Sequence, residues 1–180
     1  MRSAVASVFF GQVAESAGIV SAHAGFRHAP DGDEVALITA WETPEAALAV
    51  LGSDMRRAQT VPGLSEHVEV LSVDHYEVDD SILGSTPAAP EVLRIAAGSI
   101  ELGGDVQIQQ ELRRRLGSLG SDVSAAYVGR RMRGRNVEVV LVTVWNERPI
   151  DRPLEEPIWP DIAARYESFW VETYEPIDSR

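Results

Sequence analysis

The chain has 180 residues, an apolar fraction of 44 % and a net charge of −12, which suit one sizeable globular domain or two small ones. It has no cysteine, and all sixteen basic residues are arginine, so disulfides, thiolate metal sites, a cysteine nucleophile and lysine Schiff-base chemistry are excluded. The acidic balance argues against a nucleic-acid partner because phosphates would be repelled, and no apolar run is long enough to span a membrane.

The N-terminal segment predicts an amphipathic helix. A signal peptide is the alternative for such a short apolar segment, but polar residues interrupt it at regular intervals. Its apolar side chains recur at helical spacing, at Val5, Val8, Phe9, Val13 and Ala17. The helix interpretation is therefore favoured, and we expect a cytoplasmic protein.

One segment of the sequence is repeated later in the chain. Residues 34–42, EVALITAWE, return as residues 138–146, EVVLVTVWN, and each copy carries Thr-x-Trp near its end. The same offset of 104 residues aligns the segments that precede them, 19–27 and 123–131. Short connections rich in turn-forming residues join the two segments of each copy. Each copy therefore predicts a β-hairpin of two half-buried strands.

The flanks of the hairpins extend the repeat. A helix is predicted to begin at Pro44, and the corresponding stretch of the second copy is too rich in proline for a long helix. Residues 69–78 and 167–176 align at an offset of 98 and predict equivalent last strands. A strand at 91–102 and a helix at 105–120 precede the second hairpin. The second unit then runs strand, helix, strand, strand, helix, strand, which is the ferredoxin-like order.

The repeat predicts an α+β chain of two tandem ferredoxin-like units with antiparallel sheets. Residues 1–84 form the first unit, 85–90 a linker and 91–180 the second unit. The first unit has no room for an opening strand, so either that strand is absent or the native N-terminus lies upstream of Met1. A four-stranded sheet with helices on one side leaves its other face bare, and a second copy would cover it.

Two such units, each with a strand that ends in Thr-x-Trp, resemble the dimeric α/β-barrel superfamily and its antibiotic-biosynthesis monooxygenases. Most relatives pair two chains to close a barrel, so the resemblance implies an intramolecular pseudo-dimer here, either monomeric or paired again as a homodimer. Heme-degrading members use an Asn, a Trp and a His whose positions fall near Ala97, Val50 or Leu154, and Thr60. All three are absent, so heme is disfavoured and no cofactor is expected.

Three polar residues are weak candidates for catalysis. His23 lies in the middle of a predicted strand, and Tyr127 is its counterpart in the second copy. Either could act as a base or a hydrogen-bond donor, although a polar residue satisfied within the core is the simpler interpretation. Arg94 lies within an apolar strand, where it needs a carboxylate partner or a ligand if it points inward. The histidines lack metal-ligand spacing, so no metal site is expected.

Large aromatic residues are the candidates for lining a ligand pocket. They pack in a core by the simpler interpretation, or form the wall of an apolar pocket between sheet and helices. The candidates are Trp41, Trp145, Trp159 and Phe169. We expect either a small-molecule-binding or stress-associated protein without catalysis, or a cofactor-independent monooxygenase that acts on an aromatic or polycyclic substrate. The expected partner in both cases is an apolar or aromatic small molecule.

Overall fold

The computed structural model describes residues 2–51, 69, 72–83, 90–148 and 156–177. The chain is α+β, and it divides into two compact units, residues 1–75 with 176–180, and residues 76–175. The repeat predicted the boundary at residue 84. The predicted linker at 85–90 lies outside the described residues except for Pro90. Within the described ranges, no helix is both long and apolar enough to cross a membrane.

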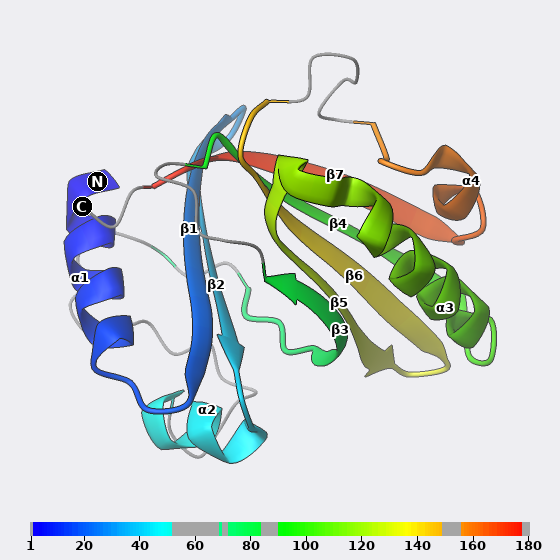
Figure 1. Ribbon diagram of the computed structural model, residues 1–180, viewed down its shortest axis with the longest axis horizontal. Coiled ribbons are helices and arrows are strands. Elements are labelled where there is room, and N and C mark those ends of the chain that lie inside the picture. The colour runs from blue at the N-terminus through cyan, green and yellow to red at the C-terminus, as the bar shows by residue number, and fades with distance from the viewer. Residues whose placement is uncertain (1, 52–68, 70–71, 84–89, 149–155, 178–180) are drawn as a thin grey trace. The chain divides into compact units, whose positions relative to one another are not determined.

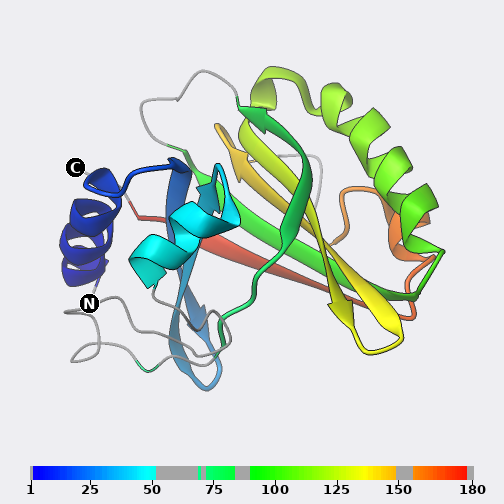
Figure 2. The same cartoon turned by 90° about the horizontal axis from the view of Figure 1, so that it is seen from below.

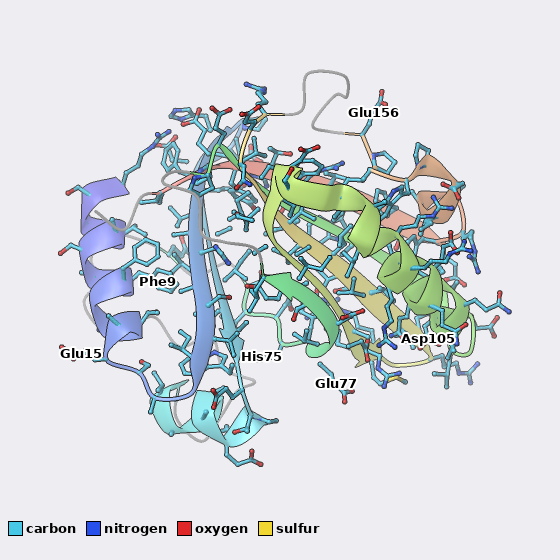
Figure 3. The ribbon with its side chains drawn as sticks, in the orientation of Figure 1. Phe9, Glu15, His75, Glu77, Asp105 and Glu156 are labelled. Atoms are coloured by element: carbon cyan, nitrogen blue, oxygen red, sulfur yellow. The ribbon has the colours of Figure 1, made fainter. Side chains whose placement is uncertain are left out.

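The first unit holds the predicted N-terminal helix and the first hairpin (Figure 1). Its elements are α1 (Arg2–Ala14), β1 (Ile19–Ala29), β2 (Gly32–Trp41) and α2 (Pro44–Leu51). Val5 and Phe9 of α1 are buried in a small core with Ala24 of β1, and Figure 3 shows Phe9 directed from α1 toward the strand. The helical spacing seen in the sequence therefore marks the face of α1 that packs on β1.

The second unit is an antiparallel sheet covered on one face by helices (Figures 1 and 2). Its five strands lie in the order β7-β4-β6-β5-β3. The elements in chain order are β3 (Glu77–Leu83), β4 (Val92–Glu101), α3 (Asp105–Leu116), a 3-10 helix (Gly117–Asp122), β5 (Val123–Arg133), β6 (Asn136–Trp145), α4 (Pro160–Ala163) and β7 (Ser168–Pro176). From β4 to β7 the unit has the predicted order of strands and helices.

The two hairpins have the same register. Ile19 faces Trp41 in the first, and Val123 faces Trp145 in the second, each pair offset by 104 residues. A register shift follows at the same place in both, after Ile19 and after Val123. Both predicted hairpins are therefore confirmed, and the register shift is a further feature that they share.

The last strand predicted for the first copy differs from the structure. Residues 72–76 are not in a strand, and β3 begins only at Glu77. This strand pairs with β5 and belongs to the second compact unit. The reason is burial: in this register Ile82 packs against the core beneath α3, whereas Val73 of the predicted strand is 40 % exposed. The α-helix predicted at 105–120 is also shorter: α3 ends at Leu116, and the chain continues as the 3-10 helix, in which Gly120 has a positive φ of 61°.

Candidate functional site

An apolar pocket lies between the sheet and the helices of the second unit. Its volume is about 30 Å³. Strands β4, β6 and β7 form its floor, and α3, α4 and the segment before α4 form its walls. The residues that line it are Ala96, Leu112, Val139, Leu141, Pro157, Ile158, Trp159, Ile162, Ala163, Tyr166 and Phe169.

The strand pattern explains why this face of the sheet leaves space. Alternate residues of β4 point to the helix-covered face, and the positions beneath the pocket are the small residues Ala96 and Gly98. A Cβ added at Gly98 would lie within 2.7 Å of three atoms of the Tyr166 ring. The ring therefore rests directly on the backbone of β4, which only glycine permits.

Two aromatic rings form one side of the pocket. The rings of Tyr166 and Phe169 are stacked, with centroids 5.7 Å apart and an interplanar angle of 24°. Burial raises the pKa of the Tyr166 hydroxyl. At neutral pH this group is therefore protonated and can act as a hydrogen-bond donor, not as a base.

An arginine of α3 holds α4 against the pocket. Arg115 donates to both carboxylate oxygens of Asp161, at 2.9 and 2.6 Å, and its Nε donates to Glu111 at 2.5 Å. These hydrogen bonds from Arg115 lower the pKa of Asp161, and Asp161 in turn raises the pKa of Arg115. This bidentate ion pair between Arg115 and Asp161 links α3 to α4. Since Ile162 and Ala163 of α4 line the pocket, the pair supports one side of the pocket.

A cluster of polar side chains around Glu138 lies on the face of the sheet opposite the pocket. Glu138 of β6 is 8 % exposed and accepts hydrogen bonds from Nε of Arg131, at 2.8 Å, and from the hydroxyl of Tyr76. The Arg131 guanidinium also lies 4.8 Å from the centre of the Tyr76 ring. The first hairpin has the equivalent pair, in which Nε of Arg27 donates to Glu34 at 2.8 Å. The pair recurs at an offset of 104 residues.

Carboxylates surround Arg130 where β3, β5 and α3 meet. Its guanidinium nitrogens lie 3.6 Å from Glu77, 3.6 Å from Asp79 and 3.8 Å from Asp105, and Figure 3 labels Glu77 near the start of β3 and Asp105 at the start of α3. Burial raises the pKa of Asp79, while the charge of Arg130 opposes that shift. Within the described part of the chain, no three His, Cys, Asp or Glu side chains are arranged to hold a metal ion.

The four residues predicted to line a pocket lie in three different places in the structure. Trp159 and Phe169 line the pocket. Trp145 lies in the core of the same unit but is not among the lining residues, and Trp41 belongs to the first unit. The predicted lining residues that lie at the pocket are therefore the two from the C-terminal part of the chain, whereas Thr-x-Trp marks the end of a hairpin.

The three catalytic candidates occupy three different places in the fold. None of His23, Tyr127 and Arg94 is among its described lining residues. His23 belongs to the first unit, where burial lowers its pKa and favours the neutral imidazole. Tyr127 is 5 % exposed on the face of the sheet opposite the helices, and Arg94, 4 % exposed, lies on the helix-covered face beside Thr143 and Thr173.

Tyr166, which lines the pocket, and Gly98, on which its ring lies, were not among the site residues predicted from the sequence. A glycine in the middle of a buried strand is itself a signal of close approach by another group. The sequence could not show that the approaching group is the ring of Tyr166, 68 residues later.

The chain was compared with known proteins. No protein-family model matches it, and neither does any curated protein sequence. A solved structure described as an anthrone oxidase-like protein superimposes with a TM-score of 0.60, covering 95 % of this chain and 82 % of that one, at 13 % sequence identity. At this identity the likeness concerns the fold alone, and it agrees with the barrel-like α+β fold implied by the resemblance to dimeric α/β barrels.

Proposed function

We propose that this chain binds a flat, apolar aromatic molecule in the pocket of the second unit. The observation that supports this proposal most directly is the lining of the pocket, which is apolar apart from the polar edges of Tyr166 and Trp159. The nearly parallel rings of Tyr166 and Phe169 favour a ligand that can stack. Apolar walls with few polar groups are typical of sites for small organic ligands.

Binding is better supported than catalysis. Tyr166 is the only described lining residue with an ionisable side chain, and its raised pKa keeps it protonated. Direct oxidation of a methylene carbon activated by neighbouring aromatic rings begins with removal of a proton, which needs a base within reach. The described lining provides a hydrogen-bond donor and no such base.

Fluorene and its saturated analogue perhydrofluorene test the binding proposal. We expect fluorene to change the tryptophan fluorescence of the protein with a saturable dependence on concentration, since Trp159 lines the pocket. Perhydrofluorene has the same carbon skeleton but no flat rings and should bind much more weakly. Equal binding of the two compounds, or no binding of fluorene, would contradict the proposal.

Adjacent alanines of α4 supply a matched pair of variants. Ala163 lines the pocket, whereas Ala164 is exposed at the end of the helix. Ala163→Leu adds three carbons to the pocket and should abolish fluorene binding, and Ala164→Leu should leave it unchanged. A loss in both variants would indicate a disturbed helix and not a filled pocket.

We further propose that the chain is a tandem of two ferredoxin-like half-barrels that together form a pseudo-dimer. The sequence repeat supports this proposal, as do the shared hairpin register and the Arg–Glu pair at equivalent positions. A single chain that covers its own sheets should sediment as a monomer in analytical ultracentrifugation. A stable dimer at micromolar concentration would instead favour the homodimer alternative.

Oxidation of an anthrone-type compound is the second candidate function, favoured by the solved structure of an anthrone oxidase-like protein. In this reaction anthrone and O₂ give anthraquinone and water: the methylene carbon loses two hydrogens and gains one oxygen atom, and the other oxygen atom leaves as water. Faster formation of anthraquinone than in buffer, lost in Ala163→Leu, would support it. A rate equal to that in buffer would leave binding as the function.

A further inference from the structure

The ring of Tyr166 lies against the backbone of Gly98 and beside Phe169, and this position is the ring seat. We propose that an aromatic ring of the ligand replaces the Tyr166 ring in the seat when the ligand binds. Ligand entry then requires the Tyr166 side chain to rotate away from β4. This inference rests on the proposed function, because it assumes that the pocket receives a flat aromatic molecule. It adds to that function a residue that controls access to the pocket and sets the shape of the ligand.

The size of the pocket is the first reason. Its volume is about 30 Å³. An engineered protein cavity that binds benzene measures roughly 150 Å³, so an aromatic ring does not fit in the space as it stands. Something must move before a ligand enters, and the ring of Tyr166 is a lining group of the required size and shape.

The seat itself has the shape of a flat ring. Its floor is the backbone of Gly98, where no Cβ intervenes, and a Cβ there would lie within 2.7 Å of the Tyr166 ring atoms. Its side is the ring of Phe169, inclined by only 24° to that of Tyr166. A slot between a bare strand and a nearly parallel ring accepts planar molecules and rejects puckered saturated ones, which are thicker.

The contacts that the Tyr166 ring makes with Gly98 and Phe169 are apolar. Its hydroxyl has no hydrogen-bond partner among the described residues. The backbone around it is fixed instead, since the amide of Tyr166 donates to the carbonyl of Ala163 at 3.2 Å and that of Glu167 donates to Ser99 at 2.8 Å. The movement therefore needs rotation of one side chain and no change of fold.

Three versions of residue 166 test the inference by fluorene titration. Tyr166→Ala empties the seat and should bind fluorene about tenfold more tightly than the wild type, because no ring has to be displaced. Tyr166→Phe keeps the ring and loses only the hydroxyl, so it should not show this gain in affinity. Equal or weaker binding by Tyr166→Ala would show that Tyr166 is a fixed wall, and would overturn the inference while leaving the proposed function intact.

The remaining outcomes separate the two proposals. Binding by Tyr166→Ala without binding by the wild type would support the seat and contradict the proposed function. No binding by either protein would overturn both. The seat can also be filled with phenol, which is the part of the tyrosine side chain that alanine lacks: phenol should raise the melting temperature of Tyr166→Ala and leave that of Tyr166→Phe unchanged.

A second measurement keeps the inference testable if Tyr166→Ala fails to fold. In the wild type labelled with 3-fluorotyrosine, the ¹⁹F resonance of Tyr166, assigned with Tyr166→Phe, should move toward the position of an exposed tyrosine on addition of fluorene. The same shift should occur without fluorene in Gly98→Ala, because the new Cβ expels the ring. A resonance that stays in place when fluorene binds would overturn the inference.

Discussion

The indole nitrogen of Trp145 donates a hydrogen bond of 2.9 Å to the hydroxyl oxygen of Thr143, two residues earlier on β6. Trp41 makes the same 2.9 Å bond to Thr39 on β2. Residues two apart on a strand share a face, so the threonine can satisfy the indole N–H wherever the tryptophan ring is covered. The repeated Thr-x-Trp is therefore a structural unit that ends each hairpin.

The first prediction concerns this bond. Thr143 is 0 % exposed and Trp145 7 %, so Thr143→Val should leave a buried indole N–H without a partner. We expect the free energy of unfolding to fall by about 1–3 kcal/mol in urea denaturation. Thr39→Val is the matched control, in which Trp41 is only partly buried, and it should cost clearly less. Equal losses in the two variants would contradict the burial argument.

The Arg–Glu pairs of the two hairpins give the second prediction. Glu138 and Arg131 have side chains 11 % and 16 % exposed, against 28 % and 26 % for Glu34 and Arg27. Glu138→Gln removes a carboxylate charge that pairs with Arg131 in a buried site, so the free energy of unfolding should fall by about 3 kcal/mol. Glu34→Gln should cost about 1 kcal/mol or less. The same denaturation experiment measures both, and a larger loss for Glu34→Gln would refute the interpretation.

Asp79 provides a prediction about pH. Burial raises its pKa in the folded state above the ordinary 3.8, so its ionised form disfavours folding. The stabilisation that comes from protonation of Asp79 in the folded state is fully present below pH 3.8, and it is lost as the pH rises through the folded-state pKa. Asp79→Asn should therefore have an equal or higher melting temperature than the wild type at pH 7, and the advantage should disappear near pH 3. A melting temperature that falls at pH 7 would show that the contact with Arg130 outweighs burial.

The bidentate ion pair between Arg115 and Asp161 should affect ligand binding in the pocket. Arg115→Lys has one nitrogen in place of the two that contact Asp161 and cannot form the bidentate pair, so α4 should be held less firmly and fluorene should bind more weakly. The pKa of Asp161 is lowered in the folded state, so this contribution is present above pH 3.8 and lost as the pH falls through the folded-state pKa. Arg114→Lys is the control, since Arg114 contacts Glu111 and not α4. Unchanged affinity in Arg115→Lys would contradict this role.

Local patterns were enough to predict most of the elements. The spacing of Val5 and Phe9 predicted α1, and the alternating, repeated segments with short turns predicted both hairpins. These features depend on residues close together in the chain, which is why a sequence shows them. The pairing of β3 with β5 was missed because two strands far apart in sequence choose each other by burial, here that of Ile82.

The sequence by itself determined the class of the protein, its repeated hairpins and the chemistry that it excludes, because composition and periodicity are written in neighbouring residues. Only the tertiary structure decided where an apolar pocket forms. It left His23, Tyr127 and Arg94 out of the described lining of the pocket and brought Tyr166 onto Gly98. That contact joins β4 to a turn 68 residues later, and it depends on which face of the sheet each side chain occupies, a choice that packing makes and local sequence does not.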